Sequence, residues 1–256
     1  MSLSVLMSYR MWQRNWDVFR ALWLYNIGGV LVEPLFLLLA VGFGIGSLVS
    51  SDIFDGLSYG QFIAPGIIAG YAMFHATGEC TWGTYLRMEN QHTFDGILAT
   101  PMSAGELTVG ELLWGATRGL MSVAAVLVMA SAFGLIRTPM SLALLPIGLL
   151  VGFTFSAVAM CYTAVARSIN VLESFYTLVL TPMFFFSGAF YPVSNMPTVV
   201  QPFIWALPLT PAVRLMRDIV TEQMGMVTLA SFVLVVLWGV VFTPLAMWLM
   251  RRRLVK

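Results

Sequence analysis

The chain has 256 residues, of which 59% are hydrophobic and only 10% are charged. A soluble domain carries about 25% charged residues, so most of this chain cannot face water and is expected to face lipid. The formal net charge of +1 offers no basic surface, and no nucleic-acid partner is expected.

Residues 1–20 are predicted to form an amphipathic helix that lies in the membrane interface. Arg10, Arg14 and Asp17 fall between apolar residues that recur at spacings of four and three, which is typical of a helix with one apolar face. The apolar positions are Val5, Tyr9, Trp12, Trp16 and Phe19.

Six segments are long and apolar enough to be membrane spans, because a span needs about 20 such residues. The predicted fold is therefore an all-α integral membrane protein with six transmembrane helices, and residues 1–256 form one membrane domain. The predicted spans are 22–49, 61–84, 107–134, 141–166, 171–190 and 226–249.

The segment 189–224, before the last span, is apolar but interrupted by prolines, which break helices. It is predicted to form short re-entrant helices at the outer face. Non-helical backbone at membrane depth must be shielded by protein or line a cavity.

The distribution of lysine and arginine predicts the orientation. With six spans both termini lie on one side, and nine of the 13 basic residues fall on that side against three on the other. The excess places both termini in the cytoplasm. The longest cytoplasmic loop, 85–106, is predicted to contain a short amphipathic helix over 87–99 that stops near Pro101.

Ionisable residues inside spans are costly and therefore informative. Glu33 and Arg118 each lie about eleven residues into their spans, at a depth of roughly 16 Å. They are predicted to pair directly or through water; the alternative is that each faces a polar cavity alone. Glu79 and Glu111 lie nearer the cytoplasmic ends, where they can reach the lipid headgroups.

No motif predicts a catalytic, metal or nucleotide site. His75 and Glu79 have metal-ligand spacing, but a third ligand is not evident, and polar packing is the preferred interpretation. Gly42, Gly44 and Gly46 sit at the end of a span and not in a phosphate loop, and no Walker motif occurs. Pairs of small residues four apart predict close helix packing; they are Gly42/Gly46, Gly66/Gly70, Gly115/Gly119 and Gly148/Gly152.

Aromatic residues cluster in 184–191 and 203–205. Anchoring at the membrane interface is the preferred interpretation. The alternative is a lining for an amphipathic or saccharide-bearing ligand.

A proline-rich element resembles the permeases of ABC-2 type transporters. Ser187 and Gly188 are followed by Pro192 and Pro197, and then by Pro208 within Leu-Pro-Leu-Thr-Pro. Leu207 stands where the family often has Asn. The resemblance covers essentially the whole chain, and within the family it is most similar to the permeases of rhizobial nodulation-factor (lipo-oligosaccharide) exporters. It also includes Glu33-Pro34-Leu35, residues 42–46, residues 87–91 and residues 251–254.

The resemblance implies a transport subunit that is not itself an enzyme. Two copies are expected to form the pathway in the bacterial inner membrane, and each is expected to dock a separate ATP-binding subunit that holds ATP and Mg. The 87–99 helix would couple the two, with Glu89 and Asp95 as polar contacts and Phe94 as the apolar contact. Ser187, Gly188, Pro192, Pro197 and Pro208 would belong to the outer exit.

The expected substrate is a lipo-oligosaccharide or lipid-linked glycan that is exported. A multidrug or lipid exporter is the alternative within the family. An ion-coupled secondary transporter would show inverted repeats and midplane ion sites, and an intramembrane enzyme would show a convergent catalytic set; the sequence shows neither.

Overall fold

The computed structural model describes residues 4–48 and 56–255, and every regular element in these two ranges is helical. Four helical stretches have the length and hydropathy of membrane spans. They are α5 (Ala104–Ala132), the stretch Pro139–Val165 that contains α6 (Leu144–Val165), the stretch Ile169–Phe186, and α11 (Met226–Leu254).

The first two predicted spans are helical but less regular. The first is α2 (Trp23–Leu37), which continues through a π-helical turn over Leu38–Gly44 and a 3-10 turn over Ile45–Leu48. The second is α3 (Tyr59–Gly78), which runs on to Asn90 through π-helical turns at Glu79–Gly83 and Leu86–Asn90. Length and composition thus support four spans, and the count of six stays a prediction.

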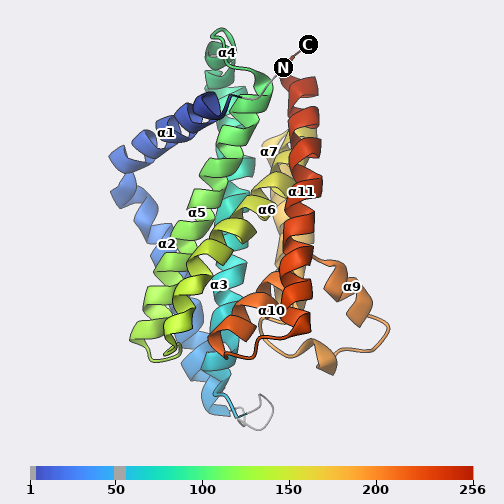
Figure 1. Ribbon diagram of the computed structural model, residues 1–256. Coiled ribbons are helices and arrows are strands. Elements are labelled where there is room, and N and C mark those ends of the chain that lie inside the picture. The colour runs from blue at the N-terminus through green and yellow to red at the C-terminus, as the bar shows by residue number, and fades with distance from the viewer. Residues whose placement is uncertain (1–3, 49–55, 256) are drawn as a thin grey trace.

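The amphipathic helix predicted for residues 1–20 is present as α1 (Val5–Ala21). Its aromatic face packs on α5, where the Trp12 indole nitrogen donates to the Thr117 hydroxyl at 2.8 Å and the Trp16 ring meets Trp114 edge to face. The chain then bends at Leu22 into α2, so α1 runs across one end of the bundle (Figure 1).

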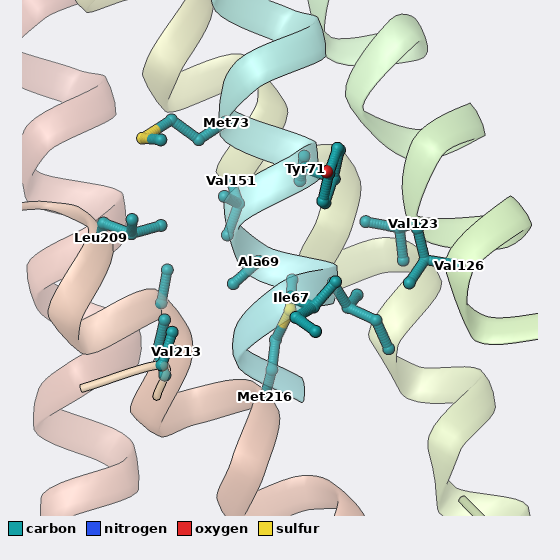
Figure 2. Packing of buried hydrophobic residues seen from close by; sticks show 14 of the residues in the cluster. Ile67, Ala69, Tyr71, Met73, Val123, Val126, Val151, Leu209, Val213 and Met216 are labelled. Atoms are coloured by element: carbon teal, nitrogen blue, oxygen red, sulfur yellow. The ribbon is translucent and has the colours of Figure 1, made fainter. Parts of the chain in front are cut away.

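The central helix of the bundle is α3. Nearly every residue from Phe62 to Met73 is buried, because α5, α6 and α10 (Leu209–Val220) pack around this segment. Figure 2 shows Val123 and Val126 of α5 on one side of α3, and Val213 and Met216 of α10 on the other.

Glycines allow α5 and α6 to approach closely, as their spacing predicts. A Cβ on Gly119 would lie 2.9 Å from the Cα of Gly152, and a Cβ on Gly115 would lie 2.3 Å from the Ser156 hydroxyl. Two of the predicted small-residue pairs therefore lie at the same helix contact.

The segment 189–224 contains a 3-10 turn (Val193–Asn195), α9 (Gln201–Ala206) and the longer α10. Pro197 lies in the turn before α9, where its carbonyl accepts from the Val200 amide, and Pro208 is buried at the start of α10. The short helices are confirmed as helices, and their re-entrant path through lipid stays a prediction.

Both ends of the described chain lie at the same end of the bundle as α4 (Thr93–Leu98), whereas α9 and α10 lie toward the other end (Figure 1). The structure thus has an α4 end and an α10 end.

Candidate functional site: the α4 end and a lateral cavity

The helix predicted for residues 87–99 is divided. Residues up to Asn90 continue the α3 helix, and α4 begins only at Thr93. His92 between them has a left-handed backbone (φ 50°), which ends the first helix and turns the chain. The independent helix in this segment is therefore the six-residue α4, shorter than predicted.

The prediction for Phe94 as an apolar contact with an ATPase is wrong for this structure. Its side chain is fully buried in a cluster with Met11, Met88 and Leu107, so it anchors α4 to the bundle. The sequence could not separate these two roles, because an aromatic residue on a short amphipathic helix fits either.

Glu89 and Asp95 are both accessible at the α4 end. Glu89 accepts from the Arg253 guanidinium at 2.8 Å, and Arg253 also donates to the carbonyls of Thr163 and Ala166. Asp95 is 73% exposed and contacts His92 at 3.2 Å. Asp95 is therefore the freer carboxylate, and Glu89 ties the end of α3 to the ends of α6 and α11.

A buried network of charges lies next to the α4 end. The Arg87 guanidinium bridges Glu79, at 2.8 Å, and Glu111, at 2.5 Å. Glu111 is fully buried and also accepts from the Asn15 amide and the Thr84 hydroxyl. The prediction that Glu79 and Glu111 reach the lipid headgroups is thus wrong; both carboxylates face inward because Arg87 neutralises them.

A lateral cavity of about 660 Å³ opens midway along the bundle. Arg118, on its wall, lies fourteen residues from either end of α5. Six aromatic side chains, including Phe185, surround the charged and polar side chains of the lining. The lining includes Glu33, Tyr71, Phe74, His75, Trp82 and Tyr176.

Aromatic contacts fix the walls of the lateral cavity. The rings of Trp82 and Tyr176 stack with centroids 4.2 Å apart, and the Tyr176 hydroxyl donates to the Phe74 carbonyl at 2.7 Å. Phe74 meets Phe184 edge to face at 5.3 Å. The walls are therefore held by contacts between α3 and the stretch 176–186, and they do not depend on a ligand.

Glu33 and Arg118 line the same cavity, but the structure does not join them directly. Arg118 pairs instead with Glu79, with 3.5 Å between its Nε and a carboxylate oxygen, and its guanidinium lies 4.8 Å from the Phe19 ring. Glu33 interacts with the Tyr71 hydroxyl. The predicted pairing through water stays a prediction, as does the alternative that each residue faces a polar cavity alone; the structure places both side chains on the wall of one cavity.

Sequence reasoning missed most of this cavity. The aromatic cluster at 184–191 pointed to Phe184 and Phe185, but Tyr71, Trp82 and Tyr176 lie in other segments and have no common spacing. The available signal was the pair His75 and Glu79, two polar residues four apart inside a predicted span.

Three of the five predicted exit residues lie around a second, smaller cavity at the α10 end, of about 360 Å³, and Pro197 and Pro208 lie outside its lining. Ser187, Gly188 and Pro192 line it together with Arg217. The Arg217 guanidinium donates to the carbonyls of Gly188 (2.8 Å), Ala189 (3.4 Å) and Phe62 (3.3 Å). Gly188 has φ +81°, a conformation that favours glycine. Through these hydrogen bonds Arg217 holds the proline-rich element against α3.

We expect Arg217→Ala to destabilise the protein by about 2–3 kcal/mol, because three carbonyls lose a charged donor. Arg137→Ala, an exposed change at the same end of the bundle, should cost under about 1 kcal/mol. Thermal unfolding in detergent, followed by circular dichroism, compares the two. Equal losses would contradict the pinning role of Arg217.

The comparison with protein families decides what kind of protein carries these features. Residues 8–221 match the family described as "ABC-2 type transporter". The chain belongs to the ABC-2 type transporter family. Its resemblance to permeases, inferred above from the proline-rich element, is thereby confirmed.

Relatives of this ABC-2 protein carry one recurring name. This chain is 36% identical over 214 residues to "Nodulation protein J" of Sinorhizobium fredii, and the alignment covers 84% of this chain and 81% of the relative. It is 36% identical over 208 residues to the protein of that name in Rhizobium meliloti, covering 81% and 79%. The "Inner membrane transport permease YadH" of Escherichia coli is more distant, at 25% over 204 residues, covering 74% and 73%. Family membership indicates a membrane permease of an ABC exporter, a transport subunit and not an enzyme.

Proposed function

We propose that this chain is the membrane-spanning subunit of an ATP-driven exporter that moves a lipo-oligosaccharide or lipid-linked glycan outward across the bacterial inner membrane. The observation that carries the proposal is the family match over residues 8–221. The proposed substrate follows from the resemblance to permeases of nodulation-factor (lipo-oligosaccharide) exporters, with which the relatives named "Nodulation protein J" agree.

In this proposal two copies of the chain form the pathway, and each docks one separate ATP-binding subunit, which binds ATP and Mg. The six predicted spans cross the membrane with both termini and α4 in the cytoplasm, and the α10 end with its re-entrant helices faces outward. This orientation agrees with the excess of lysine and arginine toward the termini and α4.

The coupling path in this proposal begins at α4. Closure of the two ATP-binding subunits moves α4, which is anchored by Phe94 and continuous with the long helix of α3 through a two-residue turn. The Arg87 network joins that helix to α1 and α5. Movement at α4 is thereby transmitted to the lateral cavity, whose wall includes Glu79 and Trp82 of the same helix. A substrate that binds the inward and outward states with different affinity then gives direction.

We expect Asp95→Arg to reduce substrate-stimulated ATPase activity of the purified complex at least about tenfold, because it reverses the most accessible charge on α4. Folding should be unchanged, since Asp95 is 73% exposed and its partner is also at the surface. The measurement uses the tagged chain purified from its native membranes with the bound ATPase, identified by its Walker motif in mass spectrometry.

Glu173→Arg is the matched control, an exposed acidic residue on α7 (Ile169–Phe175) whose reversal should leave coupling intact. Full coupling in Asp95→Arg would remove α4 from the docking surface. Absence of any co-purifying ATPase would overturn the proposed function itself.

A further inference from the structure

The lateral cavity contains polar groups that the protein leaves unsatisfied. His75 Nε2 and the Nη1 of Arg118 are buried and find no hydrogen-bond partner among the described residues. The Arg118 Nε faces Glu79 at 3.5 Å, too long for a hydrogen bond. Leaving a buried donor without an acceptor is destabilising, and more so when the donor is charged. Such groups side by side on a cavity wall are explained by a ligand that supplies oxygen acceptors.

The charge of the lining limits what this ligand can be. Glu79 is already paired with Arg87. The Glu33 carboxylate opposes the single guanidinium of Arg118, so the lining has no excess positive charge and an anionic group is disfavoured. Residues 4–48 and 56–255 contain no group of three or more His, Cys, Asp or Glu side chains placed to hold a metal. A quaternary ammonium would have to sit beside the Arg118 guanidinium, which repels it. A neutral ligand remains.

The shape and chemistry of the walls specify the neutral ligand further. Phe74 and Trp82 offer flat apolar surface, while Glu33 offers acceptors and His75 and Arg118 offer donors. A pyranose ring matches this pattern, because its hydroxyls both donate and accept and its C–H face packs on aromatic rings. The volume of about 660 Å³ lies in the range of small-molecule sites.

We infer that the lateral cavity binds a sugar ring of the transported amphiphile, with Arg118 and His75 donating to its oxygens, Glu33 accepting from its hydroxyls, and Trp82 packing on its C–H face. The inference rests on the proposed function for the identity of the ligand as cargo. The binding site itself is a property of this chain's own residues.

The test measures binding of octyl glucoside, below its micellar concentration, to the full complex in lipid nanodiscs by titration calorimetry without nucleotide. Octyl phosphate and octyltrimethylammonium are the anionic and cationic probes with the same chain. We expect saturable binding of the glucoside that is at least about tenfold tighter than binding of either charged probe.

Cavity variants locate the site. Trp82→Leu and Glu33→Gln should each weaken glucoside binding about tenfold, whereas Trp23→Leu, at an exposed tryptophan outside the cavity, should not. Glu33→Gln keeps the size of the side chain and lies at an exposed position, so it tests the site even if Trp82→Leu folds poorly.

The outcomes separate the inference from the proposed function. No saturable glucoside binding, preference for a charged probe, or binding unaffected by both cavity variants would overturn the sugar site, even if ATPase coupling through α4 holds. Cavity-dependent glucoside binding in a preparation without coupled ATPase would leave the site standing and overturn the exporter.

Discussion

Arg87→Met is expected to destabilise the protein by about 3–5 kcal/mol, the largest loss of any single change considered for this chain. Arg87 is the shared partner of Glu79 and Glu111, and Glu111 is fully buried. Removing one member of a buried charge pair leaves the other charged and desolvated, which costs more than the pair itself contributes. Unfolding by SDS in mixed micelles, followed by circular dichroism, measures the loss.

Two comparisons make this prediction specific to the network. Arg167→Met removes an exposed arginine from the same end of the bundle and should cost under about 1 kcal/mol. Adding Glu111→Gln to Arg87→Met should recover a large part of the loss, because the buried carboxylate is then neutral. If Arg87→Met costs no more than Arg167→Met, the network does not stabilise the fold.

Gly119→Val should destabilise the protein by about 3 kcal/mol through overpacking. A Cβ on Gly119 would lie 2.9 Å from the Gly152 Cα and 3.2 Å from the Ala72 carbonyl oxygen. Both obstacles are backbone atoms, so a change of rotamer cannot relieve the clash, and α3 and α6 must both move away from α5. The apparent melting temperature of the detergent-solubilised protein, followed by size-exclusion chromatography after heating, should fall.

Gly29→Val is the matched control, because a Cβ at Gly29 meets no heavy atom within 4 Å and the residue lies on the exposed face of α2. The same change of residue in a helix should there have little effect or a small stabilising one. Similar melting temperatures for the two variants would show that α5 and α6 do not pack through glycine.

The fold could be predicted from sequence wherever contact with lipid determines which residues of a helix are apolar. Long apolar runs predicted α5, α6 and α11, and the aromatic repeat predicted α1, since both patterns follow from the environment of a single helix. The division of 87–99 could not be predicted, because it depends on the left-handed turn at His92, a residue with no strong preference for that conformation.

The candidate site was harder to predict than the fold. Depth along a helix predicts Glu33 and Arg118 at one level, and both line the lateral cavity, but rotation about the helix axis decides which residues meet, and Arg118 turns toward Glu79. Phe94 was assigned outward although it is buried, because amphipathic spacing does not tell which apolar residue is covered by the same chain.

The π-helical turns at Glu79–Gly83 and Leu86–Asn90 give the long α3 helix a mechanical property of its own. A π turn holds one residue more than an α turn, so its conversion rotates everything beyond it by roughly 100° about the axis, the angle between successive residues. If α4 docks the ATP-binding subunit as proposed, conversion of these turns would carry its movement to the cavity as rotation about the helix axis, without sliding of the helix along its length.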